Sequence, residues 1–212
     1  MRVLLLVDLQ NDFMPGGTLA VADGDRVVPV ANALMPHFGL VVATQDWHPA
    51  GHGSFASAHP GTALGDIMQL GGLPQVLWPD HCVQGTPGAS FHSALNVAGI
   101  DHVVRKGSDP DVDSYSSFFD NGHARATGLA EWCSVRGVEE VVLLGLATEY
   151  CVKYSALDAL GLGLRVMVVR DGCRAVDLAE GDGERAFVEM AAAGARVLAT
   201  DEVLRLVDGG SS

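Results

Sequence analysis

Short apolar segments alternate with amphipathic stretches along the whole chain. Six of these segments are apolar throughout and too short for helices, which is typical of strands buried on both faces of a parallel sheet. The predicted strands are 3–7, 40–44, 102–105, 141–144, 164–169 and 196–199. Helical periodicity predicts helices at 25–38, 90–98, 123–136, 177–193 and 201–206. A further helix is expected directly after Thr148, which can serve as its N-cap.

Strict alternation of strands and helices predicts a three-layer α/β/α domain around a doubly wound, mostly parallel sheet. Six strands are too few for a closed eight-stranded barrel, so an open sheet is favoured. We expect a single domain over 1–207 and a flexible tail at 208–212. Residues from about 46 to 88 form a long insertion rich in Gly, Pro, His and Ser. Such an irregular insertion in a compact domain is usually functional.

Chemically active residues follow four of the predicted strands. Asp8, Asp46, Lys106 and Cys151 lie just past the ends of the first, second, third and fourth strands, respectively. Ligands of open parallel sheets bind beyond the carboxyl ends of the strands, at the point where the strand order reverses. We therefore expect these four side chains to share one crevice.

Three of these residues match the parts of a nucleophilic catalyst. Cys151 can attack as the nucleophile, Asp8 can take its proton, and Lys106 can hold Asp8 ionised. Cys151 would lie in the first turn of a helix, where the helix dipole lowers the pKa of a thiol. A lone cysteine is more often a small core residue, and each charged residue can be an ordinary polar strand terminus. Their joint occurrence at matching strand ends favours catalysis.

A second set of residues suits a metal ion. Asp46 and His48 are two residues apart, so they point to the same side of an extended segment. His81 can complete an oxygen and nitrogen ligand set for Zn²⁺, Fe²⁺ or Mn²⁺. His52 is a fourth candidate. Loop histidines are common surface residues, so the prediction depends on the set as a whole.

Three aromatic residues, Phe13, Trp78 and Tyr115, lie in loops over the same predicted crevice. They can form the walls of a site for a flat aromatic ligand, although ordinary loop packing explains any one of them equally well.

Composition excludes several classes of partner. The chain has 13 Lys and Arg against 26 Asp and Glu, and its net charge of −13 argues against nucleic acid or anionic membrane. No apolar run is long enough to span a bilayer, and the apolar start is too short for a signal peptide. The four cysteines contain no Cys-x-x-Cys pair, as expected of reduced thiols. We expect a cytoplasmic protein, either a monomer or a small homo-oligomer.

Five short motifs, in this order, closely resemble the nicotinamidase (pyrazinamidase) branch of the isochorismatase-like cysteine hydrolase family. They are Asp-Leu-Gln-Asn-Asp-Phe at 8–13, Thr-Gln-Asp-Trp-His-Pro at 44–49, Leu-Trp-Pro-Asp-His-Cys at 77–82, Arg-Lys-Gly at 105–107 and Gly-Leu-Ala-Thr-Glu-Tyr-Cys at 145–151. The similarity runs through essentially the whole chain.

The resemblance implies a catalytic triad of Asp8, Lys106 and Cys151. It also implies a non-prolyl cis peptide between Leu146 and Ala147, with the backbone N–H groups of Ala147 and Cys151 as an oxyanion hole. The residues that the resemblance expects to contact substrate, together with the aromatic wall, are Phe13, Trp78, Tyr115, Leu146 and Ala147.

By the same similarity, Asp46, His48 and His81 hold one divalent ion, with Zn²⁺ as the first candidate and Fe²⁺ or Mn²⁺ as alternatives. Relatives differ in whether the position of His52 ligates directly, through water, or at all. The ion is expected to engage the pyridine ring nitrogen of the substrate.

The implied activity is the hydrolysis of nicotinamide to nicotinic acid and ammonia in NAD salvage, with pyrazinamide as a further substrate, through a thioester on Cys151. Three alternatives stay open. The chain can be a related hydrolase of ureido or carbamoyl compounds, a metal-binding or redox-sensing protein whose Cys151 is oxidised reversibly, or an inactive scaffold. The metal motif argues against the first of these, because the branches that act on such compounds lack it.

Overall fold

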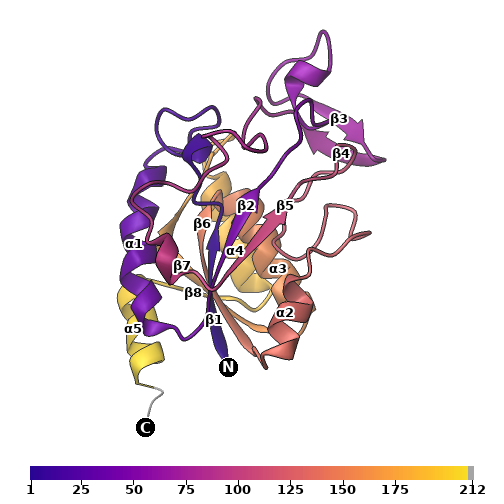
Figure 1. Ribbon diagram of the computed structural model, residues 1–212. Coiled ribbons are helices and arrows are strands. Elements are labelled where there is room, and N and C mark those ends of the chain that lie inside the picture. The colour runs from indigo at the N-terminus through magenta and orange to yellow at the C-terminus, as the bar shows by residue number, and fades with distance from the viewer. Residues whose placement is uncertain (210–212) are drawn as a thin grey trace.

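The computed structural model describes residues 1–209, and its centre is a six-stranded sheet with helices on both faces (Figure 1). The strands of this sheet are β1 (Arg2–Val7), β2 (Val41–Asp46), β5 (His102–Lys106), β6 (Glu140–Leu146), β7 (Arg165–Arg174) and β8 (Arg196–Leu198). The α-helices are α1 (Val27–Leu34), α2 (Leu129–Val135), α3 (Lys153–Gly161), α4 (Asp182–Ala192) and α5 (Thr200–Asp208). All neighbouring strands are parallel, which confirms the predicted fold class.

The order of the strands across the sheet is β5-β2-β1-β6-β7-β8. From β1, strands β2 and β5 are added in turn toward one edge of the sheet, and β6, β7 and β8 are then added toward the other. The strand order therefore reverses between β1 and β6. Val7 lies beside Gly145 in the register of these two strands. Asp8 and the segment after Leu146 therefore leave the sheet side by side, at the place where doubly wound folds bind ligands.

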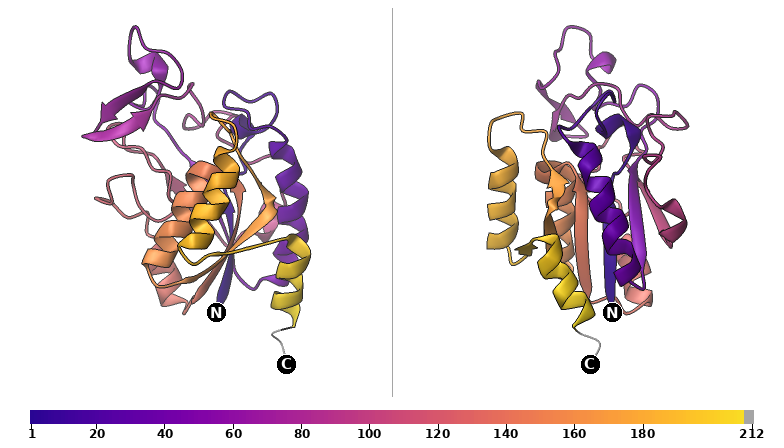
Figure 2. Two further views of the ribbon diagram at one scale, coloured as in Figure 1. Left: turned by 180° about the vertical axis from the view of Figure 1, so that it is seen from behind. Right: turned by 90° about the vertical axis from the view of Figure 1, so that its left-hand side faces the viewer.

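Helices α1 and α5 pack together on one face of the sheet, and α2, α3 and α4 cover the other (Figures 1 and 2). Both central strands are therefore buried on both sides. Leu4, Leu6, Val142 and Leu144 are inaccessible to solvent, which explains why these strands are apolar at every position and not at alternate ones. Within residues 1–209, no helix has the length and apolarity that crossing a bilayer requires.

The prediction of a helix at 90–98 is wrong. Only a short 3₁₀ turn, Val97–Gly99, forms near its end. Phe91 instead forms a bridge with Gln10, and the N–H of His92 bonds to the carbonyl of Leu9. The backbone of this segment thus pairs with the loop after β1, a non-local partner that helical periodicity does not detect.

Other predicted helices are shorter in the structure. Those expected from 123 and 177 begin later, at α2 and α4, directly after Gly128 and Gly181, whose φ angles are 93° and 83°. The helix expected at 25–38 is α-helical only over α1, with a 3₁₀ turn at either end. Asp208, which we expected to begin a flexible tail, is the last residue of α5, and 210–212 lie outside the described residues.

The long insertion is more regular than expected. It contains an antiparallel hairpin of β3 (Ile67–Leu70) and β4 (Leu73–Val76), which projects beyond the carboxyl ends of the main strands (Figure 1). Strand β7 also runs further than predicted, because its pairing with β6 is interrupted by a bulge between Leu143 and Gly145 and resumes where Gly145 pairs with Cys173. Gly145 has a φ of 142°, and a Cβ there would lie 2.1 Å from the carbonyl oxygen of Val7. Only glycine fits this position.

Candidate active site

The ammonium of Lys106, at the end of β5, is fully buried and joins the other three strand-end residues. Its Nζ lies 2.9 Å from Asp8 Oδ2 and 2.5 Å from Asp46 Oδ1. It also donates to Cys151 Sγ at 3.2 Å and to the carbonyl of Ser114 at 3.0 Å. A buried cation is stable only with such partners. The structure therefore brings together all four side chains that the strand ends predicted.

Asp8 follows β1 and is completely buried. Thr44 Oγ1 donates to Asp8 Oδ1 at 2.5 Å and accepts the Asp8 N–H at 3.1 Å. Burial raises the pKa of Asp8, Lys106 opposes this, and the charge of Asp46 adds to the increase. Asp8 therefore accepts a proton more readily than an ordinary aspartate. Sequence reasoning assigned no role to Thr44, although its place two residues before Asp46 on β2 puts both on one face.

Cys151 lies in a π turn, Thr148–Val152, that leads into α3. Such turns are frequent at functional sites. Thr148 is not the N-cap that we predicted, because Ala147 occupies that position without a side-chain cap. The carbonyl of Ala147 accepts the N–H groups of Tyr150 and Val152 at 3.1 and 3.2 Å, so the turn is closed by its own backbone. The peptide bond before Ala147 is cis, as the resemblance implies.

The pKa of the Cys151 thiol is raised well above its ordinary value, so the predicted lowering is wrong. Burial is the largest cause, and the negative charges of Asp8 and Asp46 add to it, while Lys106 opposes. These neighbours outweigh the helix terminus because the thiol is buried among them. The thiol is therefore protonated at neutral pH, and a base would be needed for it to act as a nucleophile.

We expect iodoacetamide to alkylate Cys151 more slowly at pH 7 than it alkylates free cysteine, because only the thiolate reacts. The rate should continue to rise as the pH passes 9.0, the ordinary thiol value. Mass spectrometry of the peptide that contains Cys151 measures this rate, and a Cys151→Ala variant identifies the background. Fast alkylation that does not depend on pH between 6 and 9 would mean that the resting residue is a thiolate.

Three ligating atoms converge at the end of β2. Asp46 Oδ2 lies 3.7 Å from His48 Nε2 and 3.7 Å from His81 Nε2. His48 Nδ1 donates to the carbonyl of Gly107, and His81 Nδ1 to that of Pro79, each at 2.8 Å. Because a carbonyl can only accept, both Nε2 atoms of the neutral rings carry a lone pair toward Asp46.

This donor set fits a divalent cation. His48 Nε2 is buried and has no hydrogen-bond partner among the described residues. Burial alone raises the pKa of Asp46, but the charge of Lys106 is the main opposing cause, and that pKa lies well below its ordinary value. Two buried carboxylates, Asp8 and Asp46, also face the single ammonium of Lys106, which leaves a formal excess of negative charge. A bound cation would offset this excess.

His52 lies outside this ligand set. Its Nε2 donates to the carbonyl of Asp109 at 2.7 Å, and its Nδ1 accepts the N–H of Ser54 at 3.1 Å. Burial lowers the pKa of His52 to about 4. The neutral ring lies 4.5 Å from that of His48, between ring centroids. Both ring nitrogens of His52 thus have hydrogen-bond partners here, but His52 also forms a second group of possible metal ligands with His48 and Asp113, so its role as a ligand stays a prediction.

A cavity opens onto these groups. The aromatic residues Phe13, Trp78 and Tyr115 line it, as predicted, together with Ala147 and Cys151. Leu146 does not line the cavity and is buried in the core.

Four further lining residues were missed: Leu19, Asp113, Tyr150 and Val176. The ring of Tyr150 is perpendicular to that of Trp78, with 4.9 Å between centroids. Tyr150 adjoins Cys151 within a quoted motif, which is a signal that could have identified it. Val176 and Asp113 lie in loops where no sequence pattern marks them.

The model of the Isochorismatase domain family matches residues 2–202 of this chain. The nicotinamidase of Escherichia coli (strain K12) is 53% identical over 198 residues, which cover 92% of each chain. The solved nicotinamidase pyrazinamidease of Acinetobacter baumanii superposes with a TM-score of 0.92 at 42% identity, covering 95% of this chain and 97% of that one. A pyrazinamidase of Pyrococcus horikoshii in complex with zinc has a TM-score of 0.76 at 37% identity, covering 93% and 98%. The chain belongs to the isochorismatase-like hydrolase family and is an amide hydrolase of its nicotinamidase branch.

Proposed function

We propose that this chain is a metal-dependent cysteine hydrolase that converts nicotinamide into nicotinic acid and ammonia in NAD salvage, and that also accepts pyrazinamide. One observation carries the proposal. A single buried ammonium, that of Lys106, contacts Asp8, Cys151 and Asp46 at once. It thereby links a nucleophile and its base to a metal-ligand set at one cavity. The relatives named nicotinamidase and pyrazinamidase support the substrate class.

In the first half of the reaction, Asp8 takes the proton of Cys151 as Sγ attacks the carboxamide carbon of the substrate. The carbonyl oxygen becomes an oxyanion, which the backbone N–H groups of Ala147 and Cys151 stabilise. The C–N bond then breaks, and Asp8 returns the proton to the departing nitrogen. Ammonia leaves, and the acyl group remains on Cys151 as a thioester.

In the second half, water attacks the thioester carbon while Asp8 takes one of its protons. The C–S bond breaks, nicotinic acid leaves, and the proton passes from Asp8 to the thiolate of Cys151. Lys106 remains charged throughout. Burial lowers its pKa, but Asp46, Asp8 and Cys151 together hold it well above the ordinary value. This fixed charge favours the thiolate as it forms.

Asp46, His48 and His81 would hold the divalent ion, and the zinc complex of a similar pyrazinamidase supports Zn²⁺ as the first candidate, with Fe²⁺ or Mn²⁺ as alternatives. When bound, the ion supplies a positive charge that engages the ring nitrogen of the substrate. Phe13 and Trp78 would then lie against the faces of the ring.

Ammonia release from nicotinamide by the purified protein tests this function. Release should fall when a chelator removes the metal and should recover with Zn²⁺, Fe²⁺ or Mn²⁺. Replacing Asp46 by alanine should weaken metal binding by at least about 100-fold, because it removes a ligand outright. Elemental analysis of the purified variant measures this loss, and Asp66→Ala, directly before the projecting hairpin, is the control.

The possible results separate the parts of the proposal. Release that persists in protein shown to be free of metal would remove the ion from the mechanism. A folded, metal-loaded enzyme that leaves nicotinamide intact but hydrolyses a ureido or carbamoyl compound would refute the substrate and retain the reaction class.

A further inference from the structure

Glu149, two residues before Cys151, is a buried carboxylate that the proposed reaction does not use. Glu149 as a whole is 6% exposed to solvent. Its Oε1 accepts the N–H of Asp177 at 2.7 Å, while Oε2 has no hydrogen-bond partner among the described residues. Burial raises the pKa of Glu149, and nearby backbone N–H groups, including that of Asp177, oppose the increase. A carboxylate is costly to bury, so this one requires an explanation.

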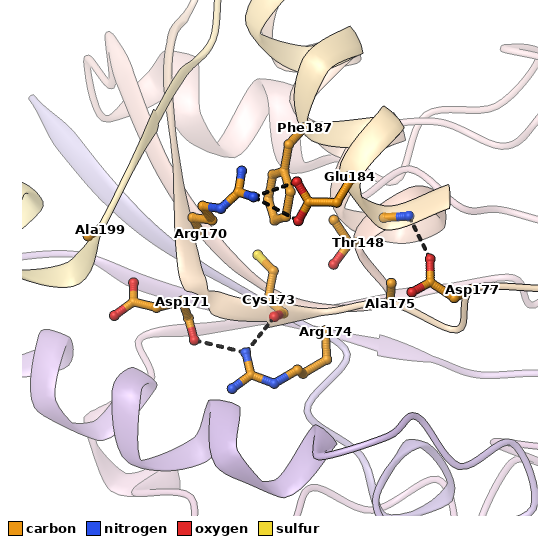
Figure 3. Close-up of a pocket in the computed structure, with 11 residues that line it drawn as sticks. Thr148, Arg170, Asp171, Cys173, Arg174, Ala175, Asp177, Glu184, Phe187 and Ala199 are labelled. Carbon is orange, nitrogen blue, oxygen red and sulfur yellow. Dashed lines mark hydrogen bonds and ion pairs between the residues drawn. The ribbon is translucent and has the colours of Figure 1, made fainter. Parts of the chain in front are cut away.

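The partner of Glu149 lies in the segment that connects β7 to α4. Asp177 has a φ of 53°, which is uncommon for a residue other than glycine. Its own carboxylate accepts the N–H of Gly183, in the first turn of α4, at 2.8 Å (Figure 3). The residue before it, Val176, lines the substrate cavity beside Cys151. Glu149 therefore connects the π turn Thr148–Val152, called here the catalytic turn, to one wall of that cavity.

The far side of the same segment faces a second cavity (Figure 3). Ala175 and Asp177 line this second cavity, whereas Val176 between them lines the substrate cavity. The segment 175–177 thus lies between the two cavities. Val176 packs against the edge of the core, and the hydrogen bond from the adjacent Asp177 N–H to Glu149 fixes the backbone beside it. Loss of that bond should therefore shift Val176.

The catalytic turn does not depend on this bond in the same way. It is closed by the two backbone hydrogen bonds to the carbonyl of Ala147, and the Cys151 thiol is held by Lys106. Loss of the Glu149 carboxylate should therefore displace Val176 more than Cys151.

We propose that Glu149 is a positioning residue for substrate binding, whose carboxylate holds Val176 in the wall of the substrate cavity through the N–H of Asp177. The inference rests on the proposed function for the identity of the substrate. It separates binding from chemistry, because Val176 lines the cavity where the ring would bind, while the reacting groups are held by other residues.

Steady-state ammonia release from nicotinamide by Glu149→Ala and Glu149→Gln tests the proposal. The alanine variant loses the acceptor of a charge-assisted hydrogen bond, so its KM should rise about tenfold while kcat changes less than about threefold. The glutamine variant keeps an oxygen that can accept the Asp177 N–H, and its KM should stay within about threefold of wild type.

The control is Asp101→Ala. Asp101 also accepts a backbone N–H, that of Val41, at 2.8 Å, but at the opposite end of the sheet from the substrate cavity. This variant loses the same kind of bond and should keep the wild-type KM.

Hydrogen exchange at the Asp177 amide supplies a readout that does not depend on turnover. Exchange should be at least about tenfold faster in Glu149→Ala than in wild type. A folded Glu149→Ala enzyme with wild-type KM overturns the proposal, whether or not its melting temperature falls. If the wild-type enzyme leaves nicotinamide intact, the proposed function fails. Unchanged exchange at the Asp177 amide in Glu149→Ala would separately refute the positioning role of Glu149.

Discussion

Replacing Cys151 by alanine abolishes the release of ammonia from nicotinamide, with an expected loss in kcat of at least about 10⁴-fold. Without the thiol no thioester can form, and water would have to attack the unactivated amide directly. The fold should persist, because the substitution removes only one sulfur atom at the wall of a cavity. The melting temperature is therefore expected to stay within a few degrees of wild type.

The measurement combines an ammonia assay under single-turnover conditions with mass spectrometry of protein quenched during turnover. Wild type should carry a nicotinoyl adduct on the peptide that contains Cys151, and the variant should not. Cys133→Ala is the matched control, since Cys133 is also a buried thiol but lies in α2. Appreciable turnover by Cys151→Ala would refute the covalent mechanism.

The second large effect is on stability. Replacing Lys106 by methionine should lower the free energy of unfolding by about 3–5 kcal/mol, because it leaves the buried carboxylates of Asp8 and Asp46 without their shared cation. For a domain of this size, that corresponds to a fall in melting temperature of roughly 6–20 °C. Activity should be lost as well, since Lys106 also donates to Cys151.

Thermal unfolding of metal-free protein, followed by circular dichroism, measures the effect of Lys106→Met. Lys153, the other lysine of the chain, pairs with Glu189 at the surface, and Lys153→Met should cost no more than about 1 kcal/mol. Adding Asp8→Asn to Lys106→Met should recover part of the lost free energy of unfolding, because it removes one of the two buried charges left without a partner. Equal melting temperatures for Lys106→Met and wild type would show that the buried ion pairs contribute nothing to stability.

The sequence alone was enough to predict that four side chains share one site, those of Asp8, Asp46, Lys106 and Cys151. Apolar runs of strand length, separated by helical periodicity, already predict a parallel sheet, and the carboxyl ends of parallel strands share one edge. The motifs at these ends carry the family resemblance that the comparisons confirm. These features are local in sequence, which is why no coordinates were needed to find them.

What the sequence did not reveal depends on contacts between distant residues. The segment 90–98 fails to form a helix because its backbone bonds to the loop after β1, and the pKa of Cys151 rises because its neighbours bury it. Glu149 reaches Asp177 across 28 positions of the chain. The sequence by itself determined which chemical groups meet at the sheet edge, because each apolar strand and the polar residue that follows it are neighbours in the chain. Only the tertiary structure decided their protonation and the residues that hold them in place, because both depend on burial and on partners far away in the chain.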